Sequence, residues 1–409
     1  MGRAIAGQRL QVNPYLRRVP GSATHAFVQT DPSRVFELTP DTFTLLAEFT
    51  TPRTIEEVIG ELREPGDPDD PDDPVAAIFA QLCELRILVP IGGELGPRPL
   101  RRTPPTVPLC GAPTWPEDHV EAQLEAGAVV VLGARFDDHT LPEYARGAAA
   151  GPEAIRQASA GYPLRERLDD GRSLGLFDLD LGRRLLAGAR VYDAGDLRGF
   201  PGCTWDEYAS ALTAELKAID ARGGRVLLLG GDHSVSLPAL LARPAPFALL
   251  HIDAHTDAAH LRYQGDLHHG NFLRHAARLG GLRQIVSLGI RGFQDTPPEI
   301  EGVPYLARSP TQLRGLDDDA LVALLAPDLP VYVSVDIDAL DPAVAPATPA
   351  PEPGGFAIAE LRRLLRVCLR DRHVVGADLV EVQGGRDGSA LTAKAALLLA
   401  VDLMDLLAR

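Results

Sequence analysis

The feature that most constrains the fold of this chain is a series of short, unbroken apolar runs in its carboxyl-terminal part. Runs of this kind are typical of parallel strands that a sheet buries on both faces. The segments between them, such as 206–221 and 356–369, carry apolar residues at helical spacing. The sequence therefore predicts a layered α/β domain. The predicted strands are 128–136, 225–232, 247–255, 284–291, 331–338 and 374–382.

Three of these predicted strands end in acidic residues and histidines. The motif DAHTD places three such residues at every second position, and VDIDALDP repeats that spacing with two aspartates. If the strand end stays extended, alternate side chains point to one side, and the carboxyl ends of parallel strands meet at one edge. In GGDHS, two glycines before the histidine permit a tight turn. The residues predicted to converge are His233, Asp253, His255, Asp257, Asp336 and Asp338.

Carboxylates and imidazoles gathered in this way predict a site for divalent cations. Four carboxylates close together would repel one another strongly unless positive charge lay between them. Mixed carboxylate and imidazole ligation suits manganese, iron or zinc, and an oxygen-rich site favours manganese. The four cysteines are scattered without a CxxC pair, which argues against both a thiolate site and a disulfide framework.

The first part of the chain has a different pattern. Residues 24–38 predict two short strands around a turn, and Thr39 and Thr54 each stand where a helix N-cap is expected. A third helix is expected over 75–88, followed by a short strand over 87–90. Segments rich in proline and glycine come next and predict a linker. The predicted boundaries are a small domain at 1–95, a linker at 96–118 and a catalytic domain at 119–409.

Seven motifs occur in order along the larger domain: GGDHSVSLPAL, HIDAHTD, HHGNFLRHA, GIRG, SVDIDALDP, APEPGG and ADLVEV. In composition and order they resemble the motifs of the arginase/agmatinase ureohydrolases, over about residues 125–409. The resemblance implies a three-layer α/β/α fold around a parallel sheet. It also implies two manganese ions, held by the six residues above, that activate a water molecule for attack on a guanidinium carbon.

The same resemblance implies roles for individual side chains. Asp257 would also hydrogen-bond the attacking water and orient it. His269 matches the proton shuttle of the family, with His268 and His275 as nearby alternatives. Glu381 matches the carboxylate that pairs with the substrate guanidinium and sets its plane.

The chain departs from the family where free-arginine enzymes hold the α-carboxylate and the α-amino group. Ala259 replaces an asparagine, and residues 292–294 (GFQ) lack the expected aspartate. Where the family has TGTPEPGG, this chain has TPAPEPGG, with Pro349 and Ala350. Where the family has EVNP, this chain has EVQG, with QG at residues 383–384. The groups that bind a free amino acid are therefore missing. This loss fits a substrate whose backbone is in amide linkage, and it also fits agmatine or a guanidino acid.

Residues 1–95 resemble the small winged-helix domains of the PqqD-like type, which recognise leader peptides of ribosomally made precursor peptides. Together, the two resemblances imply a peptide arginase that converts arginine residues of a precursor peptide into ornithine residues and urea. The leader would bind residues 1–95, and core arginines would enter the active site. The alternatives are a small-molecule ureohydrolase acting on agmatine or a guanidino acid, and a winged helix that serves DNA or another partner.

Charge and hydropathy bear on the partners and the location of the protein. The formal net charge of −16 repels phosphate backbones, which disfavours a nucleic-acid partner. The first residues lack the apolar stretch of a signal peptide, and no apolar run in the chain is long enough to cross a membrane. We therefore expect a cytoplasmic enzyme without a membrane partner. The sequence does not determine the oligomeric state, and a homo-oligomer is compatible with it.

Overall fold

The computed structural model shows two compact units. One comprises residues 1–100 and 199–208, and the other comprises residues 101–198 and 209–409. No helix in the described ranges is long and apolar enough to span a membrane. The structure describes residues 8–12, 17–19, 26–31, 34–49, 51–62, 74–85, 87–91, 100, 102–115, 124, 127–141, 144–164, 172–199, 203–243, 246–259, 267–293 and 299–409.

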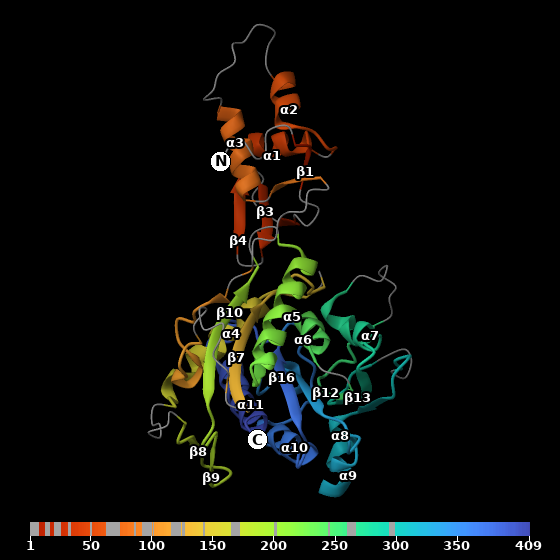
Figure 1. Cartoon of the computed structure of the whole chain (residues 1–409). Coiled ribbons are helices and arrows are strands. Elements are labelled where there is room, and N and C mark those ends of the chain that lie inside the picture. The colour runs from red at the N-terminus through yellow and green to blue at the C-terminus, as the bar shows by residue number, and fades with distance from the viewer. Residues whose placement is uncertain are drawn as a thin grey trace. The chain divides into compact units, whose positions relative to one another are not determined.

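The larger unit is built on a nine-stranded sheet in the order β14-β13-β12-β15-β16-β11-β7-β10-β6 (Figure 1). Neighbouring strands run parallel, except that β6 at one edge pairs antiparallel with β10. The strands are β6 (Arg102–Thr103), β7 (Ala128–Arg135), β10 (Val191–Arg198), β11 (Gly224–Leu229), β12 (Phe247–Ile252), β13 (Leu282–Leu288), β14 (Tyr305–Arg308), β15 (Val331–Asp336) and β16 (Val374–Val380). A separate two-stranded hairpin joins β8 (Leu176–Asp178) and β9 (Arg183–Leu185).

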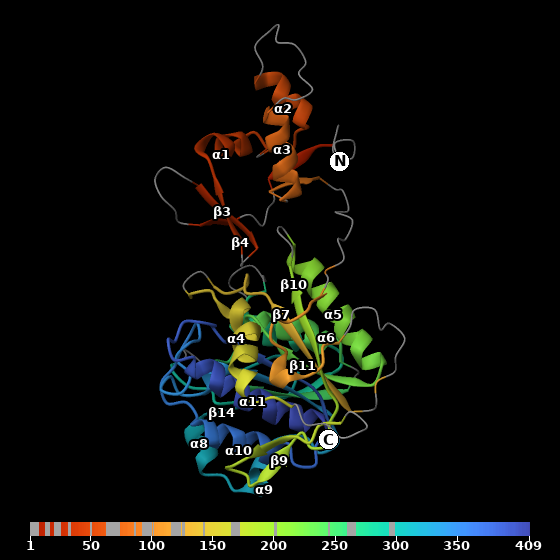
Figure 2. The same cartoon turned by 90° about the vertical axis from the view of Figure 1, so that its left-hand side faces the viewer.

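Helices cover both faces of the large sheet. Figure 2 shows α4 and α11 on one face and α5 and α6 on the other. Every residue of β12 and β15 is buried, as expected for strands between two helical layers. The predicted α/β fold is therefore confirmed. The helices are α4 (Gly151–Ala158), α5 (Trp205–Ala221), α6 (Ser236–Leu241), α7 (Phe272–Ala276), α8 (Pro310–Arg314), α9 (Asp318–Val322), α10 (Ile358–Cys368) and α11 (Leu391–Leu407).

The sheet differs from the prediction in three respects. The predicted strands end two to three residues too late in most cases, because the polar residues that follow the apolar runs belong to turns. Strands β10 and β14 were not predicted, because polar residues interrupt their apolar pattern. In β10 the cause is visible: Asp193 is fully buried and bonded to the Arg156 guanidinium, with Nε to Oδ2 at 2.9 Å. The antiparallel β6 corrects the expectation of a wholly parallel sheet.

Part of the predicted linker 96–118 is structured. Residues 102–103 form β6, and Leu109 and Cys110 are completely buried in the core of the larger unit. The backbone N–H of Leu109 donates to the Asp193 carboxylate at 2.8 Å. The prolines that suggested a linker are compatible with an edge segment, where a missing N–H donor is tolerated. Over residues 102–115 the linker prediction is therefore wrong.

The described residues up to position 91 form three helices and two small antiparallel sheets in the smaller unit. The helices are α1 (Pro40–Ala47), α2 (Ile55–Leu62) and α3 (Pro74–Glu84). One sheet joins β2 (Arg17–Val19), β3 (Ala26–Asp31) and β4 (Arg34–Leu38), and the other joins β1 (Leu10–Val12) to β5 (Leu88–Pro90). Strands β1 and β2 were not predicted, and the third helix ends earlier than 88.

The predicted N-caps in the smaller unit are present. Thr39 Oγ1 accepts a hydrogen bond from the backbone N–H of Thr42 at 3.2 Å. Thr54 Oγ1 accepts from the N–H of Glu57 at 3.1 Å, and the Glu57 carboxylate accepts from the N–H of Thr54 at 3.0 Å. This reciprocal pair is a capping box. The core contains Leu10, Leu38, Leu46, Phe49, Val58, Phe79, Leu82, Ile87 and Leu88.

Candidate metal centre and pocket

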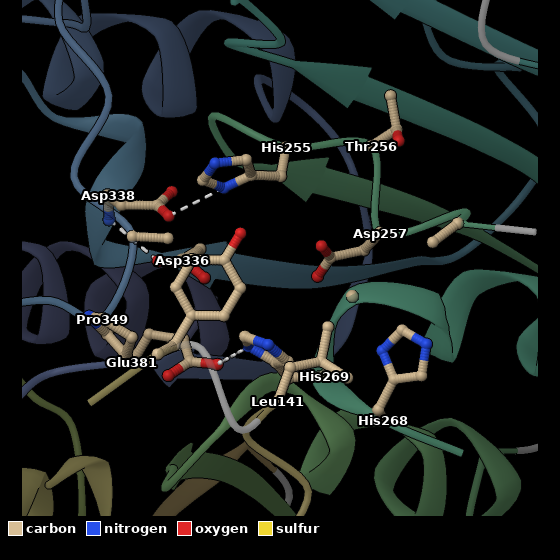
Figure 3. A pocket seen from close by; sticks show the side chains of 14 residues that line it. Leu141, His255, Thr256, Asp257, His268, His269, Asp336, Asp338, Pro349 and Glu381 are labelled. Atoms are coloured by element: carbon tan, nitrogen blue, oxygen red, sulfur yellow. Dashed lines mark hydrogen bonds and ion pairs between the residues drawn. The ribbon is translucent and has the colours of Figure 1, made fainter. Parts of the chain in front are cut away.

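The six predicted ligands lie together at the carboxyl edge of the large sheet, at or just after the ends of β11, β12 and β15. Figure 3 shows four of them, His255, Asp257, Asp336 and Asp338, around a pocket. The turn that delivers His233 depends on a glycine. A Cβ at Gly231 would lie 1.6 Å from the carbonyl oxygen of Phe136, so no other residue fits there.

Three carboxylates surround one ring nitrogen of His233. Its Nδ1 lies 2.9 Å from Asp257 Oδ2, 3.1 Å from Asp253 Oδ2 and 3.4 Å from Asp336 Oδ2. Despite these short distances, neither His233 Nδ1 nor Asp253 Oδ2 makes a hydrogen bond to any residue that the structure describes. Atoms that approach one another without hydrogen-bond geometry are arranged as ligands around a common centre would be.

The potential ligands form two groups that share Asp253. The first ligand group is His233, His251, Asp253 and Asp257, and the second is Asp253, His255 and Asp338. His255 Nδ1 is 3.0 Å from Asp338 Oδ2 and 3.6 Å from Asp253 Oδ1. Backbone N–H groups hold the carboxylates in place: Ala254 donates to Asp338 Oδ1 at 3.1 Å, and Asp338 donates to Asp336 Oδ1 at 2.8 Å. The two groups together have the donor types and the spacing for two cations.

The electrostatics of the cluster favour bound cations. Burial and the neighbouring charges of Asp338 and Asp253 raise the pKa of Asp336 well above its ordinary value. Burial and the charge of Asp253 likewise raise the pKa of Asp338. Divalent cations would offset both the desolvation and the mutual repulsion of these carboxylates. The residues present therefore fit the metal ions that the sequence implied.

The structure adds His251, which sequence reasoning missed. It is completely buried, and its Nε2 lies 2.9 Å from Asp253 Oδ2, within the first ligand group. The available signal was its position in the apolar run FALLHID, two residues before Asp253. A histidine inside an otherwise apolar buried strand requires a polar partner, which Ser287 Oγ supplies at 2.9 Å from His251 Nδ1.

The ligands converge through turns and not through extended backbone. Strand β12 ends at Ile252, and Asp257 has a left-handed backbone with φ of 43°. The expectation that an extended strand end would align the DAHTD side chains is therefore wrong. Glu381, just beyond β16, is also left-handed, with φ of 62°. Such conformations cost energy in residues other than glycine, and they concentrate at functional sites.

Glu381 and His269 form a buried pair beside the cluster (Figure 3). Glu381 Oε1 lies 3.2 Å from His269 Nδ1 and accepts from the backbone N–H of His233 at 2.9 Å. Glu381 Oε2 and His269 Nε2 are buried, and neither has a hydrogen-bond partner among the described residues. Burial opposes protonation of His269, but the adjacent Glu381 carboxylate dominates and raises the pKa of the imidazole to about 9.

The pocket has a volume of about 210 Å³ and lies directly over the cluster. His268 and His269 both border it, whereas His275 on α7 is not among the described residues that do. The Tyr144 ring packs edge-on against the His269 imidazole, with centroids 5.4 Å apart. The residues that line the pocket are Leu141, Tyr144, His255, Thr256, Asp257, Ala259, His268, His269, Gly270, Asp336, Asp338, Pro349, Ala350 and Glu381.

The positions that depart from the family motifs lie partly in this lining. Ala259, Pro349 and Ala350 border the pocket, and none of them carries a charge. Gln383 instead supports the wall, because its side-chain amide donates to the carbonyl oxygen of Ala145. Of residues 292–294, Gly292 and Phe293 are outside the lining, and residue 294 lies outside the described residues.

The carboxyl edge of the sheet gathers carboxylates and imidazoles into two groups that could each hold a cation, which is the arrangement expected of a metal-dependent α/β hydrolase. The comparison with known families is specific: the chain belongs to the arginase family, whose model matches residues 127–405. Enzymes of this family typically have a binuclear metal site.

Similar proteins lead to the same family. The chain is 36% identical over 290 residues to a proclavaminate amidinohydrolase of Streptomyces clavuligerus, covering 68% of this chain and 87% of that one. It is 36% identical over 281 residues to an agmatinase of Proteus mirabilis, covering 67% and 86%. The solved structure of the Streptomyces clavuligerus proclavaminate amidino hydrolase matches with a TM-score of 0.59 at 30% identity, covering 76% and 98%. An arginase from Medicago truncatula matches with a TM-score of 0.53 at 27% identity, covering 68% and 87%.

Proposed function

We propose that this chain is a metal-dependent hydrolase that cleaves a guanidino C–N bond and releases urea. The observation that carries the proposal is the pair of unsatisfied buried atoms, Glu381 Oε2 and His269 Nε2, beside the two ligand groups. A buried carboxylate oxygen without a partner is suited to accept an N–H of a guanidinium cation. Manganese is the proposed cation, because the oxygen-rich ligand set favours it.

The bound cations would supply an activated water molecule as the nucleophile. Glu381 Oε2 binds the substrate guanidinium and orients its plane, which brings the central carbon toward the cluster. The Asp257 carboxylate orients the water. His269, with its pKa raised to about 9, is protonated at neutral pH and holds a proton at Nε2 for the leaving nitrogen. As the bond from water oxygen to carbon forms, the C–N bond breaks, and that nitrogen leaves as an amine.

The comparisons favour a small-molecule substrate. Relatives that match about two thirds of this chain include agmatinases and a proclavaminate amidinohydrolase. The uncharged lining contributed by Ala259, Pro349 and Ala350 fits agmatine, which has no carboxylate to bind. Agmatine or a guanidino compound of similar size is therefore the first substrate class to test.

A second candidate is an arginine residue within a peptide, and a specific observation favours it. The family match begins at residue 127, and the relatives cover only about two thirds of this chain, so they leave the smaller unit unexplained. The PqqD-like pattern of residues 1–95 suits leader-peptide binding, and the uncharged lining suits an arginine whose α-groups are in amide linkage. A tethered leader would raise the local concentration of core arginines to roughly the millimolar range.

One set of assays tests both substrates. Urea release by the manganese-loaded chain is measured with agmatine, 4-guanidinobutyrate, free arginine and an arginine-containing peptide with and without its leader. The absence of urea from all of them refutes the guanidino hydrolase. Turnover of agmatine alone selects the small-molecule reading. A leader-bearing peptide with a KM well below that of its leaderless form selects the peptide reading, and equal KM values refute a leader-binding role for residues 1–95.

A further inference from the structure

A row of buried polar residues runs across four adjacent strands of the large sheet, beside the ligand groups. Ser287, His251, Ser334 and Asp378 lie opposite one another, in register, on the adjacent strands β13, β12, β15 and β16. All four are completely buried. Residues in register on neighbouring strands project to the same face, so they form one continuous row. Buried polar groups are costly unless they are hydrogen-bonded, so the row requires a role or a complete set of partners.

One end of the row sets the orientation of His233. The Ser334 hydroxyl donates its proton to Asp378 Oδ1 at 2.6 Å. Ser334 Oγ also lies 2.9 Å from His233 Nε2, and because its one proton is used toward Asp378, it can only accept a hydrogen bond from that nitrogen. Nε2 therefore carries the imidazole proton, and the lone pair is on Nδ1. That nitrogen is the atom that faces the three carboxylates of the first ligand group.

The other end of the row reaches Asp253 through His251. Ser287 Oγ lies 2.9 Å from His251 Nδ1, and His251 Nε2 lies 2.9 Å from Asp253 Oδ2. The hydrogen bond to Ser287 sets the orientation of the ring, while His251 Nε2 and Asp253 Oδ2 make no hydrogen bond with any described residue and face each other within the first ligand group. Phe272 packs against both imidazoles, stacked on His233 with a centroid distance of 4.4 Å and edge-on to His251 at 5.8 Å.

We propose that this row is a positioning layer for the metal centre, in which Ser334 and Asp378 orient His233 while Ser287 orients His251, which stands beside Asp253 in the first ligand group. The inference rests on the proposed metal-dependent function. None of the four residues is among the described residues that line the pocket, so they do not touch the substrate and act on it through the two ligand groups. Hydrogen-bond partners behind metal ligands typically change metal affinity by about 10- to 100-fold when they are removed.

The first test compares Ser334→Ala and Ser287→Ala with a matched control, Ser159→Ala. Ser159 is also completely buried, accepts from the N–H of Cys110 at 2.8 Å and donates to the carbonyl oxygen of Arg156 at 2.6 Å. It lies outside both ligand groups and the pocket lining as described. Mn²⁺ binding is measured by equilibrium dialysis of the full chain without substrate, and folding by thermal unfolding.

We expect about 10- to 100-fold weaker Mn²⁺ binding in Ser334→Ala and Ser287→Ala, and wild-type binding in Ser159→Ala. Wild-type binding in the two row variants overturns the proposal. Equal weakening in all three variants also overturns it, because the effect would then follow from general destabilisation. Tight Mn²⁺ binding by a wild-type chain that releases no urea would defeat the proposed function and leave the positioning layer standing.

A second pair of variants separates hydrogen bonding at His251 from packing. His251→Phe keeps a ring and removes both polar contacts, so Mn²⁺ binding should weaken by about 10- to 100-fold. His251→Gln keeps one polar atom toward Asp253 and one toward Ser287, so binding should stay within about threefold of the wild type. Wild-type binding in His251→Phe would show that the ring acts by shape alone, and equally weak binding in the two variants would show that keeping the polar contacts is not enough. Either result would overturn this part of the proposal.

Discussion

Glu381→Gln removes a negative charge from the pocket and preserves the shape of the side chain. Glu381 Oε1 accepts the backbone N–H of His233 at 2.9 Å, while Oε2 has no partner among the residues described. In the variant, the amide oxygen would keep the bond to His233, and the amide NH₂ would therefore face the pocket. A guanidinium cation would then meet a donor where it needs an acceptor.

The size of the effect follows from the burial of this group, whose side chain is only 3% exposed. A hydrogen bond to a charged group contributes about 1.5–3 kcal/mol, and each 1.4 kcal/mol corresponds to about a tenfold change. We therefore expect kcat/KM to fall by roughly 10- to 150-fold. The content of bound manganese should stay unchanged, because no atom of Glu381 belongs to either ligand group.

The assay is steady-state urea release with the best substrate, combined with elemental analysis of bound manganese. Glu352→Gln is the matched control, since Glu352 lies in the loop after β15 and outside the described lining of the pocket. It should retain wild-type kcat/KM. Wild-type kcat/KM in Glu381→Gln refutes guanidinium recognition by this residue. Loss of manganese in that variant would instead place Glu381 in the metal centre.

Three further predictions concern the cluster. His269→Asn should retain manganese and lose roughly 10²- to 10⁴-fold in kcat, the usual scale for loss of a general acid, whereas wild-type turnover would move this role to His268 or to water. Asp253→Ala should lose both cations by elemental analysis, because both groups share this carboxylate, while Asp338→Ala should lose one and nearly all turnover. Two cations retained in either variant would contradict the ligand assignment. Removal of metal with a chelator should lower the midpoint of thermal unfolding, and added Mn²⁺ should restore it, because binding to the folded state alone stabilises that state. An unchanged midpoint would show that the cluster does not bind manganese in the folded chain.

The sequence alone determined the class of the fold and all residues of the cluster except His251. Both depend on local patterns. Apolar runs bounded by polar residues identify buried parallel strands, and the carboxyl ends of such strands meet at one edge whatever the length of chain between them. The motifs DAHTD and VDIDALDP therefore identified residues that do lie together, although the first adopts a turn in place of the extended backbone expected.

Only the tertiary structure decided which atoms face one another. The left-handed backbone of Asp257 and Glu381 depends on contacts distant in sequence. So do the burial of Leu109 and Cys110 in the core of the larger unit and the strand β10 with its internal carboxylates. The row from Ser287 to Asp378 is the clearest case. Its four members stand on separate motifs, and only the register of four adjacent strands aligns them. Strand register is set by long-range packing, so no local pattern reveals it.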